Sequence, residues 1–327
     1  MKLKSLSITG LLTLDMHALN NEGAEGNTMM TRMVDIVDAS GQKYTVNAIS
    51  GDMFKHIQSG HLIDEALESG LPLCEGCKRF DANRICADGV FISKFDGQRP
   101  ADSAILSDTL AKCVVDDLQG ILITSEIGVD EKGKPKKRSI ARKSCIEFGW
   151  AIGKPDKVST ESYFHAKYVP EGRGKGSESA ENLGQNIFHR PASSGQYAVV
   201  VGIDLFRVSR NDISLEVVGE GQQVERRQAA LLRSVLNTFV KPTGAHRNTQ
   251  NPHIVSFEGA IATSSTSLPA PAVSALNDSY GEEMKRLAEV LNQMDSGSIA
   301  VHEFKSLSGF ASTITTILGP AAARARA

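Results

Sequence analysis

Hydrophobic and polar residues alternate near the start of the chain. Between residues 5 and 14, the even positions are mostly leucine or isoleucine and the odd positions are mostly serine or threonine. This two-residue period predicts a β-strand with one buried face. Further strands are predicted over 197–206, where valine, isoleucine and leucine fall at alternate positions, and over 254–261.

A four-residue spacing between apolar positions predicts three helices. Met53 and Ile57 show this spacing within 52–68, and two more helices are predicted over 104–118 and 225–239. The resulting order is strand, helix, strands, helix, strand. This is the order of a ferredoxin-like α+β fold, whose sheet carries its helices on one face.

Several stretches do not fit this pattern. Residues 70–100 contain cysteine and glycine, 129–143 are basic, and 169–195 are rich in Gly, Ser, Glu and Asn, so we expect three insertions or arms. Residues 263–278 have the composition of a linker. We expect one amphipathic helix and a frayed tail over 279–327.

Composition limits the classes of function. The chain has 327 residues, enough for one core domain with long insertions. Its 36 basic and 38 acidic residues nearly cancel, so nucleic-acid binding has to be local. The odd count of five cysteines and the start MKLKSLSITG argue against secretion, and no apolar run is long enough to span a membrane. We expect a cytoplasmic protein without a membrane partner.

Two basic segments are candidates for binding phosphate. Ser50 can cap the helix at 52–68, and Lys55 and His56 follow within its first turns, which suits either a phosphate seat or a solvated helix start. The segment EKGKPKKRSIARK is either a solvated loop or an arm that lies along an RNA backbone. Its candidate contacts are Arg138, Arg142 and Lys143.

Two polar segments offer contacts to RNA. GAHRNTQNPH at 244–253 is dense in hydrogen-bond donors, and its candidates are Arg247, Asn248 and Gln250; the alternative is an ordinary helix-to-strand connection. The segment NIFHRP closes the insertion at 169–195. Its candidates, Phe188, His189 and Arg190, either wedge between bases or pack the loop down.

Cysteine spacing predicts a structural zinc site. Cys74 and Cys77 form a CxxC pair, and Cys86 and Cys113 are the proposed remaining ligands. Buried reduced cysteines are the alternative. GxSxG and HExxH motifs are missing, and GRGKGS lacks the ending of a phosphate loop, so the sequence gives no reason to expect an enzyme.

Several long blocks resemble one family. In order they are SLSITGLLTLDMHALNNEG, MTRMVDIVD, NAISGDMFKHIQSGHL, LPLCEGCKRFDANRIC, NIFHRPASSGQYAVVV and GAHRNTQNPHIVSFEGAI. From about residue 3 to residue 262, the chain resembles the DevR-type CRISPR-associated autoregulator family. These proteins are the backbone subunits of type I Cascade-like complexes.

The resemblance implies a modified RNA-recognition fold shaped like a hand. Residues 1–262 would form the palm, with fingers at about 70–150 and a thumb at about 163–196. Copies would stack head to tail along one crRNA, with other Cascade subunits as partners, and present the guide for pairing with target DNA in antiviral defence. The phosphate-contacting palm would include Asn20 and Asn21, together with Ser50, Lys55, His56, Arg247, Asn248 and Gln250.

Two rival functions stay open at this point. A DNA-binding transcriptional autoregulator would need a helix-turn-helix with a basic second helix, and neither 52–68 nor 104–118 qualifies. A RAMP-type endoribonuclease would use histidine for acid–base chemistry. Its candidates would be His17, His56 and His246.

Overall fold

The computed structural model describes residues 3–168, 185–244 and 247–323. These residues form a mixed fold, in which a large, mostly antiparallel sheet is packed with helices, as the α+β prediction requires. No helix in this described part of the chain is long and apolar enough to cross a membrane.

The main sheet has β1 near its centre. Its strands lie in the order β14-β13-β1-β12-β11-β5-β4. Their bounds are Ile299–Phe304 (β14), His253–Ser264 (β13), Ser5–His17 (β1), Gln185–Asp204 (β12), Ala151–Tyr168 (β11), Lys43–Ile49 (β5) and Met33–Val37 (β4). Ile8 lies opposite Val201 on β12 and opposite Ile261 on β13, so buried side chains from three strands meet.

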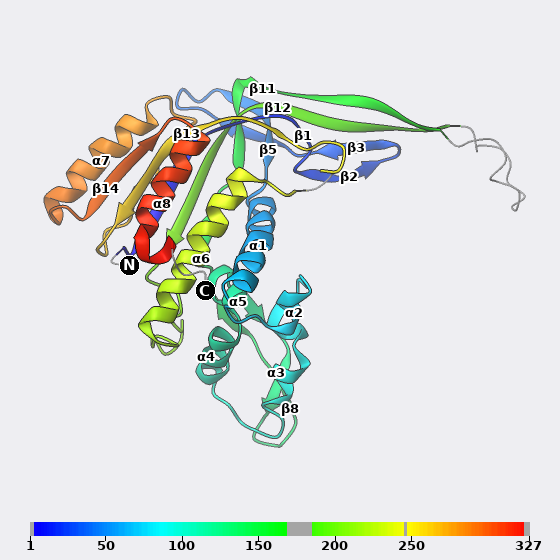
Figure 1. Cartoon of the computed structure of the whole chain (residues 1–327). Coiled ribbons are helices and arrows are strands. Elements are labelled where there is room, and N and C mark those ends of the chain that lie inside the picture. Colours follow the sequence, from blue (N-terminus) through cyan, green and yellow to red (C-terminus); the bar gives the residue numbers. More distant parts are fainter. Residues whose placement is uncertain (1–2, 169–184, 245–246, 324–327) are drawn as a thin grey trace, which may run out of the picture.

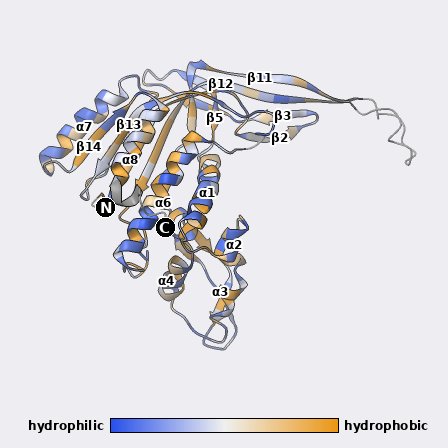
Figure 2. Cartoon of the chain, viewed as in Figure 1, coloured by the Kyte–Doolittle hydropathy of each residue, from blue (hydrophilic) through white to orange (hydrophobic). Residues whose placement is uncertain are grey.

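Three helices cover one face of this sheet: α1 (Gly51–Glu68), α6 (Gly221–Val240) and α8 (Leu307–Ala323). Hydrophobic residues gather where these helices meet the strands (Figure 2). Phe310 on α8 lies 5.0 Å from Phe257 and 5.5 Å from Phe239, measured between ring centroids. The helices predicted over 52–68 and 225–239 are therefore confirmed as α1 and α6.

The C-terminal segment is more structured than predicted. Helix α7 (Tyr280–Met294) is followed by β14, which pairs with β13, and then by α8, which enters the core. The prediction of one helix and a tail is therefore wrong. The sequence did not reveal the two later elements, because β14 is too short to show a clear period and threonines interrupt the apolar pattern of α8. Met284 of α7 packs on Ala260 and Ala262, on the face of β13 away from α8.

The predicted polar face of β1 is not open to water. Ser7 and Thr9 are buried, and the Ser7 hydroxyl donates a hydrogen bond to the carbonyl of Pro271. The linker predicted over 263–278 begins within β13, and the residues after Ser264 pass over this face, where Ala270 N–H donates to the Ser5 hydroxyl. Ser5 and Ser7 of β1 therefore hold this connection on the sheet.

A smaller lobe lies beyond α1 (Figure 1). Its elements are α2 (Glu75–Lys78), the 3-10 helix η1 (Arg84–Ala87), α3 (Gly89–Ser93), α4 (Asp102–Lys112), α5 (Val114–Gln119), β6 (Ile121–Ile123), β7 (Glu126–Val129), β8 (Pro135–Lys137) and β9 (Ile140–Arg142). Strand β10 (Ile146–Phe148) returns the chain to β12. The single helix predicted over 104–118 breaks at Cys113, whose backbone is extended.

A long β-hairpin projects from the other end of the sheet (Figure 1). In it β11 and β12 stay paired from Val158 opposite Gly195 to Tyr168 opposite Gln185. Two short strands, β2 (Asn21–Glu25) and β3 (Thr28–Thr31), lie beside the hairpin, and β3 pairs with β12 at His189. The tip of the predicted thumb, 169–184, lies outside the described residues.

Candidate nucleic-acid interface

Two polar segments that are far apart in the sequence meet at one groove. Arg190 comes from β12, and Gly244, Arg247, Asn248 and Thr249 come from the connection between α6 and β13. Together they line a groove of about 670 Å³. The structure thus brings together candidates that the sequence could only name separately.

Polar atoms at and beside the groove have no partner within the described chain. The Nε atoms of Arg190 and Arg247 and the Oε1 atom of Gln250 are buried and make no hydrogen bond there. Arg190 is nevertheless held in place, because its NH1 donates to the Thr249 hydroxyl over 3.2 Å. Gln250 Nε2 donates to the carbonyl of Pro191 over 2.9 Å. The guanidinium groups of Arg190 and Arg247, which line the groove, suit anionic or hydroxyl oxygens.

Aromatic rings flank the groove on the hairpin. The guanidinium of Arg190 lies 4.7 Å from the ring centroid of Phe188. Phe188 stacks on His165 across the strand pair, and His189 makes an edge contact with Phe164, whose side chain is exposed. The hairpin therefore offers aromatic surface next to Arg190, at Phe188 and His165, and a second aromatic pair, Phe164 and His189, on its other face.

The predicted phosphate seat at the start of α1 is closed by the protein. Ser50 is buried; its hydroxyl accepts a hydrogen bond from Met53 N–H, and its own N–H donates to Asn20 Oδ1. Asn20 is also buried. Asn21 is the first residue of β2, and its side chain lies outside the described part. Asn20 and Ser50 therefore position backbone and do not face an RNA.

Lys55 and His56 line a second groove, of about 330 Å³, together with Arg84 and Asp81. His56 is exposed and packs edge-on against Phe80. Lys55 is half-buried, and removal from water lowers its pKa, with nearby Arg84 lowering it further. This groove between α1 and the α2–η1 segment keeps the two candidates available to a ligand.

The prediction of an exposed basic arm over 129–143 is wrong for its two candidate arginines, Arg138 and Arg142. Arg138 and Arg142 are buried, with exposed fractions of 4% and 3%. Arg138 pairs with Asp102 over 2.7 Å, and Arg142 pairs with Asp117 over 2.7 Å. Both are structural cations of the small lobe, whereas Lys143 is exposed after β9.

His17 belongs to a buried chain of hydrogen bonds. Its Nε2 lies 2.8 Å from the Tyr197 hydroxyl, which donates to Asn47 Oδ1 over 2.8 Å. Leu19 N–H donates to Nδ1, so the ring is neutral with its proton on Nε2. Burial lowers the pKa of His17 to about 4. This placement does not suit an acid–base catalyst that has to reach RNA, and His246 lies outside the described residues.

Three of the four cysteines predicted to bind zinc come together. Cys74, Cys77 and Cys113 are buried with Asp116, and one ligand atom from each lies within 4.8 Å of the others. Cys86 is half-buried on η1 and is not a member of this group, so its predicted place is taken by Asp116. The cluster could hold a metal ion. The sequence showed no spacing that singled out Asp116.

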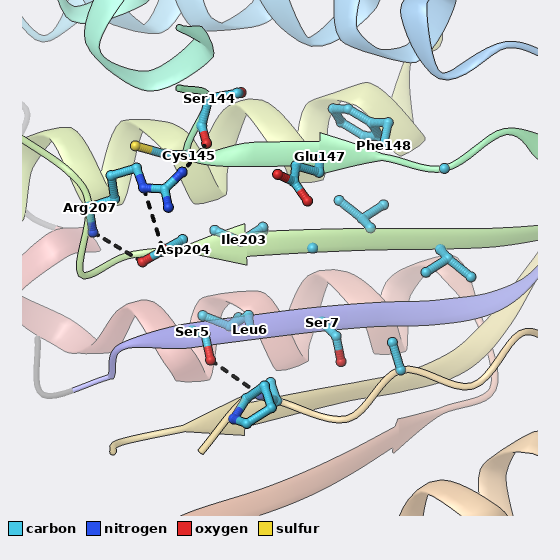
Figure 3. Close-up of a pocket in the computed structure, with 17 residues that line it drawn as sticks. Ser5, Leu6, Ser7, Ser144, Cys145, Glu147, Phe148, Ile203, Asp204 and Arg207 are labelled. Atoms are coloured by element: carbon cyan, nitrogen blue, oxygen red, sulfur yellow. Dashed lines mark hydrogen bonds and ion pairs between the residues drawn. The ribbon is translucent and has the colours of Figure 1, made fainter. Parts of the chain in front are cut away.

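A third groove lies on the sheet where β1, β10 and β12 meet residues 269–272 (Figure 3). It measures about 540 Å³. Its charged residues are Arg207, Asp204 and Glu147, and Asp204 pairs with Arg207 over 3.7 Å. Because the acidic side chains outnumber the basic one, the groove at Arg190 and Arg247 is the better candidate for a polyanion.

Comparisons with solved structures concern the fold of the whole chain. One solved chain, from a "CRISPR RNA-guided surveillance complex, pre-nicking", has a TM-score of 0.52 at 13% identity, with 96% of this chain and 99% of that chain covered. A "CRISPR RNA-guided surveillance complex" chain gives 0.48 at 14% identity over 97% and 99%. Csc2 from Thermofilum pendens gives 0.43 at 14% over 94% and 80%. The first of these shows a shared fold. No curated protein matches the sequence.

The family match defines the class of protein, which is CRISPR-associated. The family model "CRISPR-associated negative auto-regulator DevR/Csa2" matches residues 8–285. The chain belongs to this DevR/Csa2 family, which confirms the resemblance carried by its sequence blocks.

Proposed function

We propose that the chain is the crRNA-binding backbone subunit of a type I Cascade complex and performs no catalysis. Several copies bind along one guide RNA, contact one another and the other Cascade subunits, and leave the bases free to pair with target DNA in antiviral defence. The observation that carries this proposal is the convergence of Arg190 and Arg247 on one groove, each with a buried Nε donor that the described chain does not satisfy.

The arrangement of the core supports the same proposal. The elements β1, α1, β11, β12, α6 and β13 follow one another as βαββαβ, and their strands lie in the order β13-β1-β12-β11. This order supports the proposal of a modified RNA-recognition fold, in which the small lobe would be the fingers and the β11–β12 hairpin the thumb. Arginine contacts to phosphate carry no sequence information, which suits a carrier of many different guides.

RNA binding tests the groove directly. Arg247→Ala and Arg190→Ala should weaken binding to unrelated RNAs alike and reduce the slope of log affinity against log salt by about 0.7 for each lost phosphate contact. Fluorescence anisotropy on the full chain measures both quantities. Arg286→Ala is the matched control, because Arg286 is an exposed arginine on α7 that pairs with Glu283.

Three outcomes would reject the proposal. Equal losses in Arg286→Ala would mean that the groove is not the site. Strong preference for duplex DNA of the chain's own promoter would favour the negative auto-regulator named by the family. Cleavage of RNA with magnesium or manganese, lost in a histidine variant such as His56→Ala, would favour the endoribonuclease.

A further inference from the structure

We propose that Cys74, Cys77, Cys113 and Asp116 bind one structural Zn²⁺ ion, which fastens α2 to α5 inside the small lobe. Four potential ligands from two separate segments point at one buried position. The ion lies outside the RNA groove, so this inference does not depend on the proposed function.

The distances fit a tetrahedral ion. The Cys74 sulfur lies 3.5 Å from Asp116 Oδ2. A tetrahedral zinc with bonds of about 2.3 Å to sulfur and about 2.1 Å to oxygen sets that edge at about 3.6 Å. Since the four ligand atoms also lie within 4.8 Å of one another, closing them on an ion requires only small side-chain movements.

Local structure forms the first half of the site. Cys74 is the N-cap of α2, and its sulfur accepts a hydrogen bond from Cys77 N–H over 3.4 Å. Buried Asp88 accepts from Glu75 N–H over 3.0 Å and from Phe91 N–H over 2.9 Å, which fixes the turn that carries both cysteines. An outer residue that holds ligand backbone in place is typical of metal sites.

The second half comes from the break between α4 and α5. Cys113 has extended backbone there, and Asp116 follows three residues later in the first turn of α5. A three-residue step at a helix start puts both side chains on one side. The break that interrupts the predicted helix over 104–118 thus creates a ligand pair.

Asp116 gives the independent observation. Its side chain is fully buried, and its Oδ1 atom has no hydrogen-bond partner within the described chain. A buried carboxylate oxygen without a partner is costly unless a cation compensates it. Thiolate sulfur favours zinc over magnesium and calcium, and a site with three cysteines and one carboxylate is unlike the four-thiolate sites of iron–sulfur clusters.

Metal analysis of the full chain, purified without chelator, tests the proposal. We expect one zinc per chain by mass spectrometry of the elements. Replacement of the ion by Co²⁺ should give the visible bands of a tetrahedral site and charge-transfer absorption from three thiolates. Cys113→Ser and Asp116→Asn should lower the bound metal at least tenfold. Cys86→Ser, the matched control on the same lobe, should retain it.

The cobalt spectrum keeps the test decisive if a ligand variant fails to fold, because it is recorded on the unaltered chain. Folded protein that holds no zinc and gives no cobalt bands would overturn the proposal. Charge-transfer intensity for four thiolates would overturn the role of Asp116. Loss of zinc in Cys86→Ser with full retention in Asp116→Asn would also overturn the role of Asp116 as a ligand.

Discussion

Single residues change role according to their partners. Arg142 shows this most clearly, because its guanidinium donates to Asp117, Asp212 and three backbone carbonyls. Nothing adjacent in the sequence reveals these acceptors, so a basic run looked like an exposed arm. Arg247, in a similarly polar segment, keeps its Nε without a described partner. What separates the two arginines is the supply of buried acceptors, which only the folded chain displays.

His17 should make stability depend on pH. The pKa of His17 is about 4 in the folded chain, against an ordinary value of 6.5. Above pH 6.5 the imidazole is neutral in both the folded and the unfolded chain, so it does not make stability depend on pH there. As the pH falls from 6.5 to 4, His17 binds a proton in the unfolded chain but stays neutral in the folded chain. Stability then falls by about 1.4 kcal/mol per pH unit, roughly 3 kcal/mol in all.

Urea unfolding at pH values from 7.5 to 4 measures this loss for the chain and for His17→Gln. The variant should start less stable, since the bond to Tyr197 changes, but its dependence on pH should be shallower. His302→Gln, at an exposed position on β14, should keep the original slope. Equal slopes in all three proteins would show that His17 does not titrate on unfolding.

Elements were predictable where their own sequence carries the signal. The period of β1 and the four-residue spacing of α1 are local properties, and both elements formed as predicted. The partners of an element are not local. Sequence alone could not show that β14 completes the edge beside β13, or that the α4–α5 break brings Cys113 to Cys74. The candidate site was therefore found as separate segments, and its geometry came from the fold.

Close contact between β1 and β13 should make one glycine pair indispensable. Gly10 and Gly259 lie opposite each other, and a Cβ on Gly259 would overlap the carbonyl of Thr9. Gly259→Ala should therefore force the strands apart and destabilise the chain by about 1–3 kcal/mol or more. Denaturant unfolding measures the change.

Gly202→Ala is the control for that substitution. Gly202 is also a strand glycine, on β12, but a Cβ there meets no atom within 4 Å. The unfolding free energy of Gly202→Ala should differ from that of the unaltered chain by no more than about 0.5 kcal/mol. A similar loss in both variants would show that glycine is needed for the strands in general and not for this contact.

At the scale of the whole molecule, the proposed function predicts that a near-neutral chain binds long RNA as an assembly of copies. One groove should bind a short RNA weakly, whereas neighbouring copies that also touch each other raise the effective concentration at the next site. We expect cooperative binding and oligomers that lengthen with the RNA. Sedimentation or mass photometry with RNAs of increasing length checks this, and one fixed stoichiometry at every length would reject a filament.

A shortened hairpin tests which element reaches the neighbour. Tyr168 and Gln185 are paired, so an Asn-Gly turn can join them in place of 169–184. The variant should fold and bind short RNA but lose cooperativity on long RNA. If its binding curve on long RNA stays as steep as that of the full chain, contacts outside the removed segment carry the assembly.

The hairpin also has a consequence for the subunit before assembly. From Val158 to Tyr168, β11 runs roughly 33 Å at about 3.3 Å per residue. Within the described part of the chain, the pairing of β11 with β5 ends at Ile152. The outer edge of this ribbon therefore leaves backbone groups available to any other extended chain. Newly made copies that meet each other before they meet RNA are exposed to irregular aggregation. Production of the subunit in proportion to its RNA would protect the cell from this aggregation.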